Sequence, residues 1–325
     1  MTHPLDGQQR TRKYPFVNMR ISDHTVLDTI EGRHNCRLCN RSRKFFCYSC
    51  YIPVGQLEEV LPRLELPLKI DIIKHKKEID GKSSAVHAAV LAPEHVRIHT
   101  FPDIPDYRQE PGVVLIFPSA TALTVPQLFE RNVQLQIGDN YGLPKGHHMG
   151  TMLRRRMDEV EVQEPQAGDQ ESPKKTWTLD NLPIRRAVFI DSTWNQSRGI
   201  YADERIRSLR TVVLQNRLSQ FWRHQRGSPR WYLATIEAIH QFLLEVHINA
   251  WGLNGEYRGL DNLEITEGFH QLAAPLKLDT SIEDVGRMAP YNGQYDNLLF
   301  FFANMYDLIH KYYDHNDLIS YRRPI

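Results

Sequence analysis

The four cysteines of the chain stand close together, as two Cys-x-x-Cys pairs with seven residues between the pairs. Each pair can form a tight turn that presents two sulfur atoms, and four thiolates suit the tetrahedral coordination of zinc. Such a site leaves no ligand position for water, so the sequence predicts a small module over residues 25–60 around one structural zinc ion. Four free thiols or a redox pair are the alternatives. The predicted ligands are Cys36, Cys39, Cys47 and Cys50.

The sequence carries no sign of export or of a membrane segment. Residues 1–24 are polar and basic, without the apolar run of a signal peptide, and they predict a flexible leader. The most apolar stretch, Leu298 to Phe302, is far too short to cross a bilayer. We expect an intracellular protein in the nucleus or the cytosol, with the nucleus favoured, and no membrane partner. The sequence leaves the oligomeric state open and favours a monomer. Cysteines do not form structural disulfides in that reducing compartment, which again favours a metal site.

Short apolar runs recur along the chain, with helix-like segments such as Pro126 to Arg131 between them. The runs have the length and composition of strands. Alternation of strands with helices predicts an α/β fold around a mainly parallel sheet, with helices on both faces. The predicted strands are Leu68–Ile73, Val96–Phe101, Val113–Phe117, Ala187–Ile190 and Thr211–Leu214.

Two longer helices are predicted in the second half of the chain. Ile236 to Ile248 has apolar residues at helical spacing, with Thr235 as the expected N-cap and Glu237 in the electropositive first turn. Leu298 to Tyr313 is typical of an aromatic helix that packs deeply. In contrast, residues 155–175 mix charged residues, Gln, Pro and Ser without periodicity and predict a disordered insertion.

Basic residues gather in clusters although the formal net charge is only +1. Arg154–Arg156 and the region 198–230 are the densest. Such clusters can meet the phosphates of a nucleic acid. Equally, 40 Lys and Arg residues produce clusters on solvated faces without any function. Charge therefore permits RNA binding but does not show it.

The run from Ala187 to Trp194 is an apolar strand that ends in Asp191-Ser192-Thr193-Trp194. Ligand-binding loops lie at the carboxyl edge of a parallel sheet, so this position suits a functional site. Taken alone, the motif has a simpler interpretation, in which Asp191 caps the next helix and Trp194 packs in the core.

The surrounding motifs favour a functional site over this simpler interpretation. The cysteine quartet is followed by Phe117–Ser119 after an apolar strand, by Asp191–Trp194, by Phe221–Arg223 and by Leu233–Ala238. In this order they resemble the DTW-domain family of tRNA-uridine aminocarboxypropyltransferases, over roughly Arg33 to Trp251. The charged insertion and the segment beyond Trp251 depart from the compact bacterial members.

The resemblance implies a SPOUT-like catalytic domain over residues 61–260, with a knot in the C-terminal part of the sheet. Residues 261–325, which contain the predicted helix from Leu298 to Tyr313, are expected to form a helical extension. True knots are rare, and composition or periodicity gives no sign of one. It also implies that S-adenosylmethionine is the donor of a 3-amino-3-carboxypropyl group to N3 of a uridine in tRNA, with release of methylthioadenosine. Catalysis would fall to Asp191, Thr193 and Trp194. The donor would be bound by Phe117, Pro118, Ser119, Asp191, Ser192, Leu233, Thr235 and Glu237.

Each of these roles has an alternative. Asp191 either removes the N3 proton or orients the donor and balances its sulfonium charge. Trp194 stacks on adenine or uracil, or belongs to the core. Thr193 hydrogen-bonds the donor or closes the turn.

The N3 atom lies on the Watson–Crick edge, so the target uridine must be in a loop or extruded from a helix. Arginines interleaved with tryptophans after the DTW motif could hold such a loop. Competing hypotheses are a SPOUT-type RNA methyltransferase and a non-catalytic, zinc-containing RNA-binding protein. No Gly-x-Ser-x-Gly elbow or phosphate-binding Gly-x-x-x-x-Gly-Lys loop indicates a hydrolase, and the pair His147-His148 is more typical of a solvated loop. The predicted RNA-binding residues are Arg205, Arg207, Arg210, Arg217, Arg223, Arg226 and Arg230.

Overall fold

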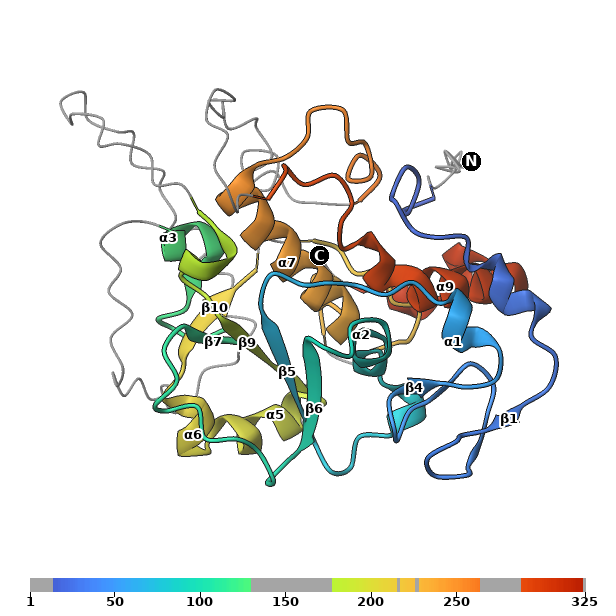
Figure 1. The fold of residues 1–325 in the computed structure, drawn as a ribbon, viewed down its shortest axis with the longest axis horizontal. Coiled ribbons are helices and arrows are strands. Elements are labelled where there is room, and N and C mark those ends of the chain that lie inside the picture. Colours follow the sequence, from blue (N-terminus) through green and yellow to red (C-terminus); the bar gives the residue numbers. More distant parts are fainter. Residues whose placement is uncertain (1–13, 130–176, 215–216, 226–227, 264–287, 324–325) are drawn as a thin grey trace, which may run out of the picture.

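A six-stranded sheet with all neighbours parallel forms the centre of the protein (Figure 1). The computed structural model describes residues 14–129, 177–214, 217–225, 228–263 and 288–323. The order of strands across the sheet is β6-β5-β9-β7-β10-β8. Their bounds are β5 Lys69–Lys74, β6 Val96–Thr100, β7 Val113–Ile116, β8 Leu123–Thr124, β9 Arg186–Asp191 and β10 Arg210–Val213.

The α/β prediction and all five predicted strands are confirmed, and burial explains why they were visible in the sequence. β5 and β9 lie between neighbours on both sides, and most of their residues are buried on both faces. A strand covered on both faces needs a continuous apolar run rather than an alternating one. β8 was missed because two residues carry no pattern.

Helices cover both faces of the sheet, as predicted (Figure 1). The larger core packs helices α2, α3, α7 and α9 over one face, and a smaller core packs α5 and α6 on the other. The helices are α1 Leu57–Val60, α2 Ala85–Leu91, α3 Val125–Phe129, α5 Trp194–Tyr201, α6 Glu204–Arg207, α7 Thr235–Trp251 and α9 Phe300–Tyr312. Short 3-10 helices are η1 His24–Thr29, η2 Asp80–Lys82, η3 Leu179–Asn181, η4 Asp296–Leu299, η5 His315–Asp317 and η6 Ile319–Arg322.

Helix α7 begins one residue earlier than its sequence pattern predicts. Ala234 occupies the N-cap position, so the prediction of Thr235 as N-cap is wrong. The Thr235 hydroxyl donates a hydrogen bond to Asp191 on the sheet instead of turning back onto its own helix. Glu237 does lie in the first turn, where it accepts the Ala234 N–H at 2.9 Å. The helix ends at Gly252, whose φ of 84° favours glycine.

The two terminal regions pack together. Phe16 is 5% exposed, and its ring lies edge-on to Phe302 and Tyr306 of α9. The Arg20 N–H donates to Asp296 at 2.7 Å. Residues 14–24 therefore differ from the flexible leader we expected, because aromatic contacts hold them. The remainder of that leader and the insertion predicted at 155–175 lie outside the described residues.

Candidate active site

Asp191 is the last residue of β9 and lies at the carboxyl edge of the sheet, in register with Lys74 at the end of β5. Its side chain is 7% exposed and accepts two hydrogen bonds. Ser83, just before α2, donates to Oδ2 at 2.7 Å, and Thr235, the first residue of α7, donates to Oδ1 at 2.6 Å. Three segments far apart in the sequence thus meet at one carboxylate.

Burial controls the charge of this carboxylate. Loss of water contact raises the pKa of Asp191, and the hydrogen bonds from Ser83 and Thr235 and the charge of Lys74 only partly oppose that rise. Lys74 itself forms an ion pair with Asp80. Asp191 is therefore a stronger base than a carboxylate on the surface.

Ser83 and Ser84 join α2 to this site. The Ser83 hydroxyl accepts the Ala85 N–H at 3.1 Å, which leaves its proton for Asp191. The Ser84 hydroxyl accepts the Ile236 N–H at 3.3 Å and so connects α2 to the first turn of α7. We did not single out these serines in the sequence. Their signal was position, since a Gly-Lys-Ser-Ser run between a strand and a helix lies at the carboxyl edge.

Glu237 lies one turn into α7 with 0% exposure. Its Oε2 accepts from the Ser219 hydroxyl at 2.6 Å and from the Ala234 N–H at 2.9 Å. Its Oε1 accepts the Gln220 N–H at 2.7 Å. Since three protein donors occupy both oxygens, Glu237 fixes the segment that leads into α7.

The residues after Asp191 begin α5. Thr193 is exposed at the N-cap position, where its N–H donates to the Gln196 side chain at 3.2 Å. The Ser192 hydroxyl donates to the Thr193 carbonyl at 3.2 Å. The Trp194 side chain lies outside the described part of the structure, so its predicted stacking role stays a prediction.

The loop after β7 is next to Asp191 because β7 pairs with β9. The Phe117 ring is 4% exposed and stacks on Tyr201 of α5, with ring centres 4.5 Å apart. Ser119 shares a hydrogen bond with Thr211 of β10. Pro118 and Leu233 are half-buried. The loop therefore adjoins the site, while the Phe117 ring belongs to the smaller core.

The four cysteine sulfurs lie within 4.8 Å of one another. Four sulfurs bound to zinc at about 2.3 Å would lie about 3.8 Å apart, so this cluster can close around one metal ion. The Cys36 and Cys47 side chains are buried, with 1% and 0% exposure. The hairpins that hold them are β1 His34–Asn35 with β2 Ser42–Arg43, and β3 Phe46–Cys47 with β4 Ile52–Pro53.

Both cysteine pairs use the same turn. Asn40 and Tyr51 directly follow the second cysteine of each pair, and both have the left-handed φ angles of 56° and 58°. The Asn40 N–H donates to the Cys36 carbonyl at 2.8 Å, and the Tyr51 N–H donates to the Cys47 carbonyl at 2.7 Å. Two equivalent turns thus bring four sulfur atoms together, which is the arrangement expected of a metal site.

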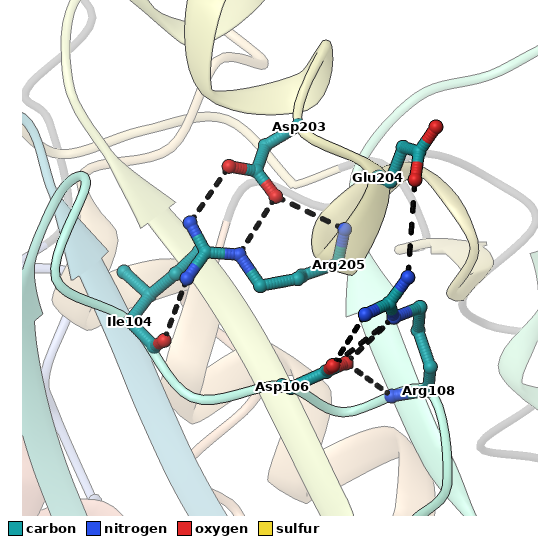
Figure 2. A network of polar contacts seen from close by, with 6 residues as sticks. All are labelled: Ile104, Asp106, Arg108, Asp203, Glu204 and Arg205. Carbon is teal, nitrogen blue, oxygen red and sulfur yellow. Dashed lines mark hydrogen bonds and ion pairs between the residues drawn. The ribbon is translucent and has the colours of Figure 1, made fainter.

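Three of the arginines predicted to bind RNA are engaged by the protein itself. Arg217 is 1% exposed and faces His240, and Arg230 is 8% exposed. Figure 2 shows that the Arg205 guanidinium binds the Asp203 carboxylate and the Ile104 carbonyl, which fixes α6 to the segment between β6 and β7. These side chains stabilise the fold, and sequence spacing alone could not separate them from surface residues.

The other predicted arginines are more accessible. Arg207 is exposed, and Arg210 and Arg223 are half-buried. Arg223 donates to the Lys82 carbonyl at 2.5 Å, close to Ser83. Arg226 and the pair His147-His148 lie outside the described residues.

A DTW domain matches residues 44–310, which is most of the chain. The chain belongs to the DTW-domain family. The match extends beyond Trp251 to His310 in α9, further than the motifs indicated, because α9 is part of the larger core. Among the residues that the structure describes, no helix is long and apolar enough to cross a membrane.

Curated relatives of this DTW-domain chain carry the name tRNA-uridine aminocarboxypropyltransferase 1. The Mus musculus protein is 37% identical over 317 residues, which is 95% of this chain and 88% of the relative. The Homo sapiens protein is 38% identical over 300 residues, with 91% and 84% covered. The Xenopus tropicalis protein is 35% identical over 300 residues, with 90% and 85% covered. No solved structure matches the chain.

Proposed function

We propose that this protein is a tRNA-uridine aminocarboxypropyltransferase. The observation that carries the proposal is its identity of 35–38% with relatives of that name over nine-tenths or more of its length. The buried carboxylate at the end of β9 is consistent with it, because Asp191 and Thr235, from two family motifs that lie apart in sequence, meet there.

In the proposed reaction, uridine N3 attacks the methylene carbon that joins the methionine arm of S-adenosylmethionine to the sulfonium. An N–C bond forms and a C–S bond breaks, the sulfur keeps the bonding electrons, and methylthioadenosine leaves. The N3 proton must pass to a base. Because three carbons are attached to the sulfonium, the group transferred is decided by which carbon is held in line with N3.

Asp191 is our candidate for that base. Burial raises the pKa of its carboxyl group, which favours proton uptake, and its two hydroxyl partners hold it in one orientation. The same charge would also balance the sulfonium. The N-terminus of α7 adds a positive helix end beside the carboxylate and helps to keep Asp191 ionised in the resting site.

We propose that the donor lies at the carboxyl edge, against the loops after β7, β9 and β10 and the start of α7. A knot in this region is also part of the proposal. Two features support it: β9 is inserted between β5 and β7, and the chain after β10 returns past Ser219 to reach Asp191 through Thr235. The residues proposed to contact the donor are Phe117, Pro118, Ser119, Asp191, Ser192, Thr193, Trp194, Leu233 and Thr235, with Glu237 fixing their support.

We assign structural zinc to the cysteine cluster. The convergence of four sulfurs through two equivalent turns supports this assignment. Zinc would replace a hydrophobic core in the module and tie its two hairpins together.

The test of function uses S-adenosylmethionine labelled separately in the methyl group and in the carboxyl group. Unmodified tRNA should take up the carboxyl label and not the methyl label, and its digest should contain 3-(3-amino-3-carboxypropyl)uridine. Transfer of the methyl label would instead establish a methyltransferase, and binding of tRNA without transfer of either label would establish a non-catalytic RNA-binding protein.

Two further expectations concern the location of the protein in the cell and its oligomeric state. Imaging of the tagged chain tests the expected nuclear location, and light scattering of the purified protein tests whether it is a monomer.

A further inference from the structure

A cavity of about 180 Å³ lies between the cysteine module and the main domain, and its lining includes Ser83, the hydrogen-bond donor to Asp191. One wall comes from the module, with Lys44, Phe45 and Tyr48. The opposite wall comes from the segment before α2 and from Phe221 to Arg223. We call this the module cavity. It is smaller than the pockets that enclose drug-sized ligands, about 300 Å³ or more, and suits one nucleotide group.

The lining of the module cavity is strongly basic. Asp80 is its one acidic residue among those the structure describes, and Asp80 is already paired with Lys74. The excess of positive charge therefore has no counterpart in the described part of the cavity wall. The basic residues of the lining are Arg33, Arg43, Lys44, Lys82 and Arg223.

Arg43 is a buried cation that forms no ion pair with a carboxylate among the described residues. Its side chain is 7% exposed, and its guanidinium lies 3.8 Å from the centre of the Tyr48 ring. It donates to the Ser42 carbonyl at 3.0 Å, while its buried Nε has no hydrogen-bond partner among the described residues. A buried guanidinium with an unsatisfied N–H group is costly, and an anion entering the cavity could supply the missing acceptor.

His87 of α2 is a second incompletely bonded group in the cavity wall. It is 4% exposed, and its buried Nδ1 has no hydrogen-bond partner in the described structure. Burial and the nearby charge of Arg223 lower the pKa of His87 to about 3. The imidazole is therefore neutral at pH 7 and can offer one donor and one acceptor, as recognition of a base or ribose requires.

Aromatic side chains complete the lining. Phe45, Tyr48 and Phe221 are half-buried, so each keeps accessible ring surface. Accessible aromatic rings beside cations commonly bind single-stranded nucleic acid, because bases stack on the rings and phosphates pair with the positive charges.

One residue belongs both to the cavity wall and to the proposed reaction centre. Ser83 lines the cavity and also donates the 2.7 Å hydrogen bond to Asp191. A nucleotide in the cavity would thus be a neighbour of a uridine placed at Asp191.

We propose that the module cavity binds a nucleotide that flanks the target uridine, so that the cysteine module forms one wall of the RNA-binding site. This inference rests on the proposed function. A single donor carboxylate would need one or two cations, whereas five basic residues with stacking rings match a stretch of RNA.

The test is the variant Lys44→Glu with Lys82→Glu. Both residues are exposed, so the fold should be retained. The control is Lys69→Glu with Arg185→Glu, an equal change of charge at the amino edge of the sheet, away from the cavity. Affinity for tRNA is measured across a salt series, alongside the KM for S-adenosylmethionine at saturating tRNA, zinc content and thermal stability.

The cavity variant should weaken tRNA binding about tenfold or more and reduce the slope of log Kd against log salt by about 1–2, because each phosphate contact contributes roughly 0.9. The donor KM should not change, and the control should bind like the wild type. Unchanged affinity and salt slope in a folded, zinc-loaded cavity variant would overturn the inference, as would a raised donor KM with unchanged tRNA binding. Failure of the proposed function is a separate result, since the wild type would then not transfer the carboxyl label.

Discussion

The substitution Glu237→Gln tests the support beneath the proposed site with the smallest change of shape. Glu237 is fully buried and accepts hydrogen bonds from Ser219, Gln220 and Ala234. An amide has one acceptor oxygen, so its NH₂ group must face at least one of these donors. That donor then stays buried and unsatisfied.

The expected loss of stability has two parts. Leaving one buried donor without an acceptor costs about 1–3 kcal/mol. In addition, Arg217 is 1% exposed, and burial lowers its pKa while the charge of Glu237 opposes that change. Neutralising Glu237 removes part of the compensation for this buried cation, a loss below the roughly 3–5 kcal/mol for breaking a direct buried ion pair. We expect the free energy of unfolding to fall by about 3–5 kcal/mol in total.

Denaturant unfolding at pH 7 measures this loss, and Glu256→Gln is the control. Glu256 is exposed, so its substitution should change stability by about 0.5 kcal/mol at most. If Glu237→Gln lowered stability by less than about 1 kcal/mol, the assignment of Glu237 as a charged structural anchor would be wrong.

Three further predictions concern the site, the metal and pH. Asp191→Asn should lower the transfer rate by about 10²–10⁴-fold, as loss of a general base does. It should not lower the free energy of unfolding, because burial raises the Asp191 pKa and the fold therefore disfavours the charged form. A large loss of stability would contradict this expectation. Cys47→Ser should reduce bound zinc from about one per chain towards none in elemental analysis, while Ser49→Ala should retain it. Burial lowers the pKa of His87 to about 3 and of His247 to about 4, so the unfolded chain takes up protons first as the pH falls. Lowering the pH from 6.5 towards 4 should therefore reduce the free energy of unfolding by about 1.4 kcal/mol per pH unit for each of these imidazoles. His87→Leu should remove one such contribution, and an unchanged slope of the free energy of unfolding against pH would refute the assignment.

The sequence predicted those parts of the fold that depend on local pattern. Strands such as β5 and β9 are continuous apolar runs because both their faces are covered. The pairing of β9 with β5 and β7 had no local signal, since register depends on contacts between distant segments. The packing of Phe16 on α9 was missed for the same reason, as one aromatic residue in a polar segment gives no period.

The site was predictable only in outline. Asp191 and Thr235 are named by family motifs, and the structure brings them within hydrogen-bond distance. Ser83 was not predicted, because a serine after a strand has many uses, and only its contact with Asp191 distinguishes it. Arg217 illustrates the opposite error. Its place in an arginine-rich stretch indicates a surface, yet the chain turns it inward toward His240.

Ser83 connects two incompletely compensated groups, because it donates a hydrogen bond to Asp191 and lines the same cavity as Arg43 of the cysteine module. Within the described part of the chain, Asp191 is a buried carboxylate held by two hydroxyl groups, and Arg43 is a buried cation that pairs with no carboxylate. A fold selected for stability alone would pair such groups or replace them with apolar ones. The incomplete compensation of both groups is understandable if the missing partners arrive with the substrates, a sulfonium and a proton at Asp191 and a phosphate at Arg43. The cysteine module would then have a direct role in the reaction, because it would position the RNA while the carboxyl edge of the sheet binds the donor.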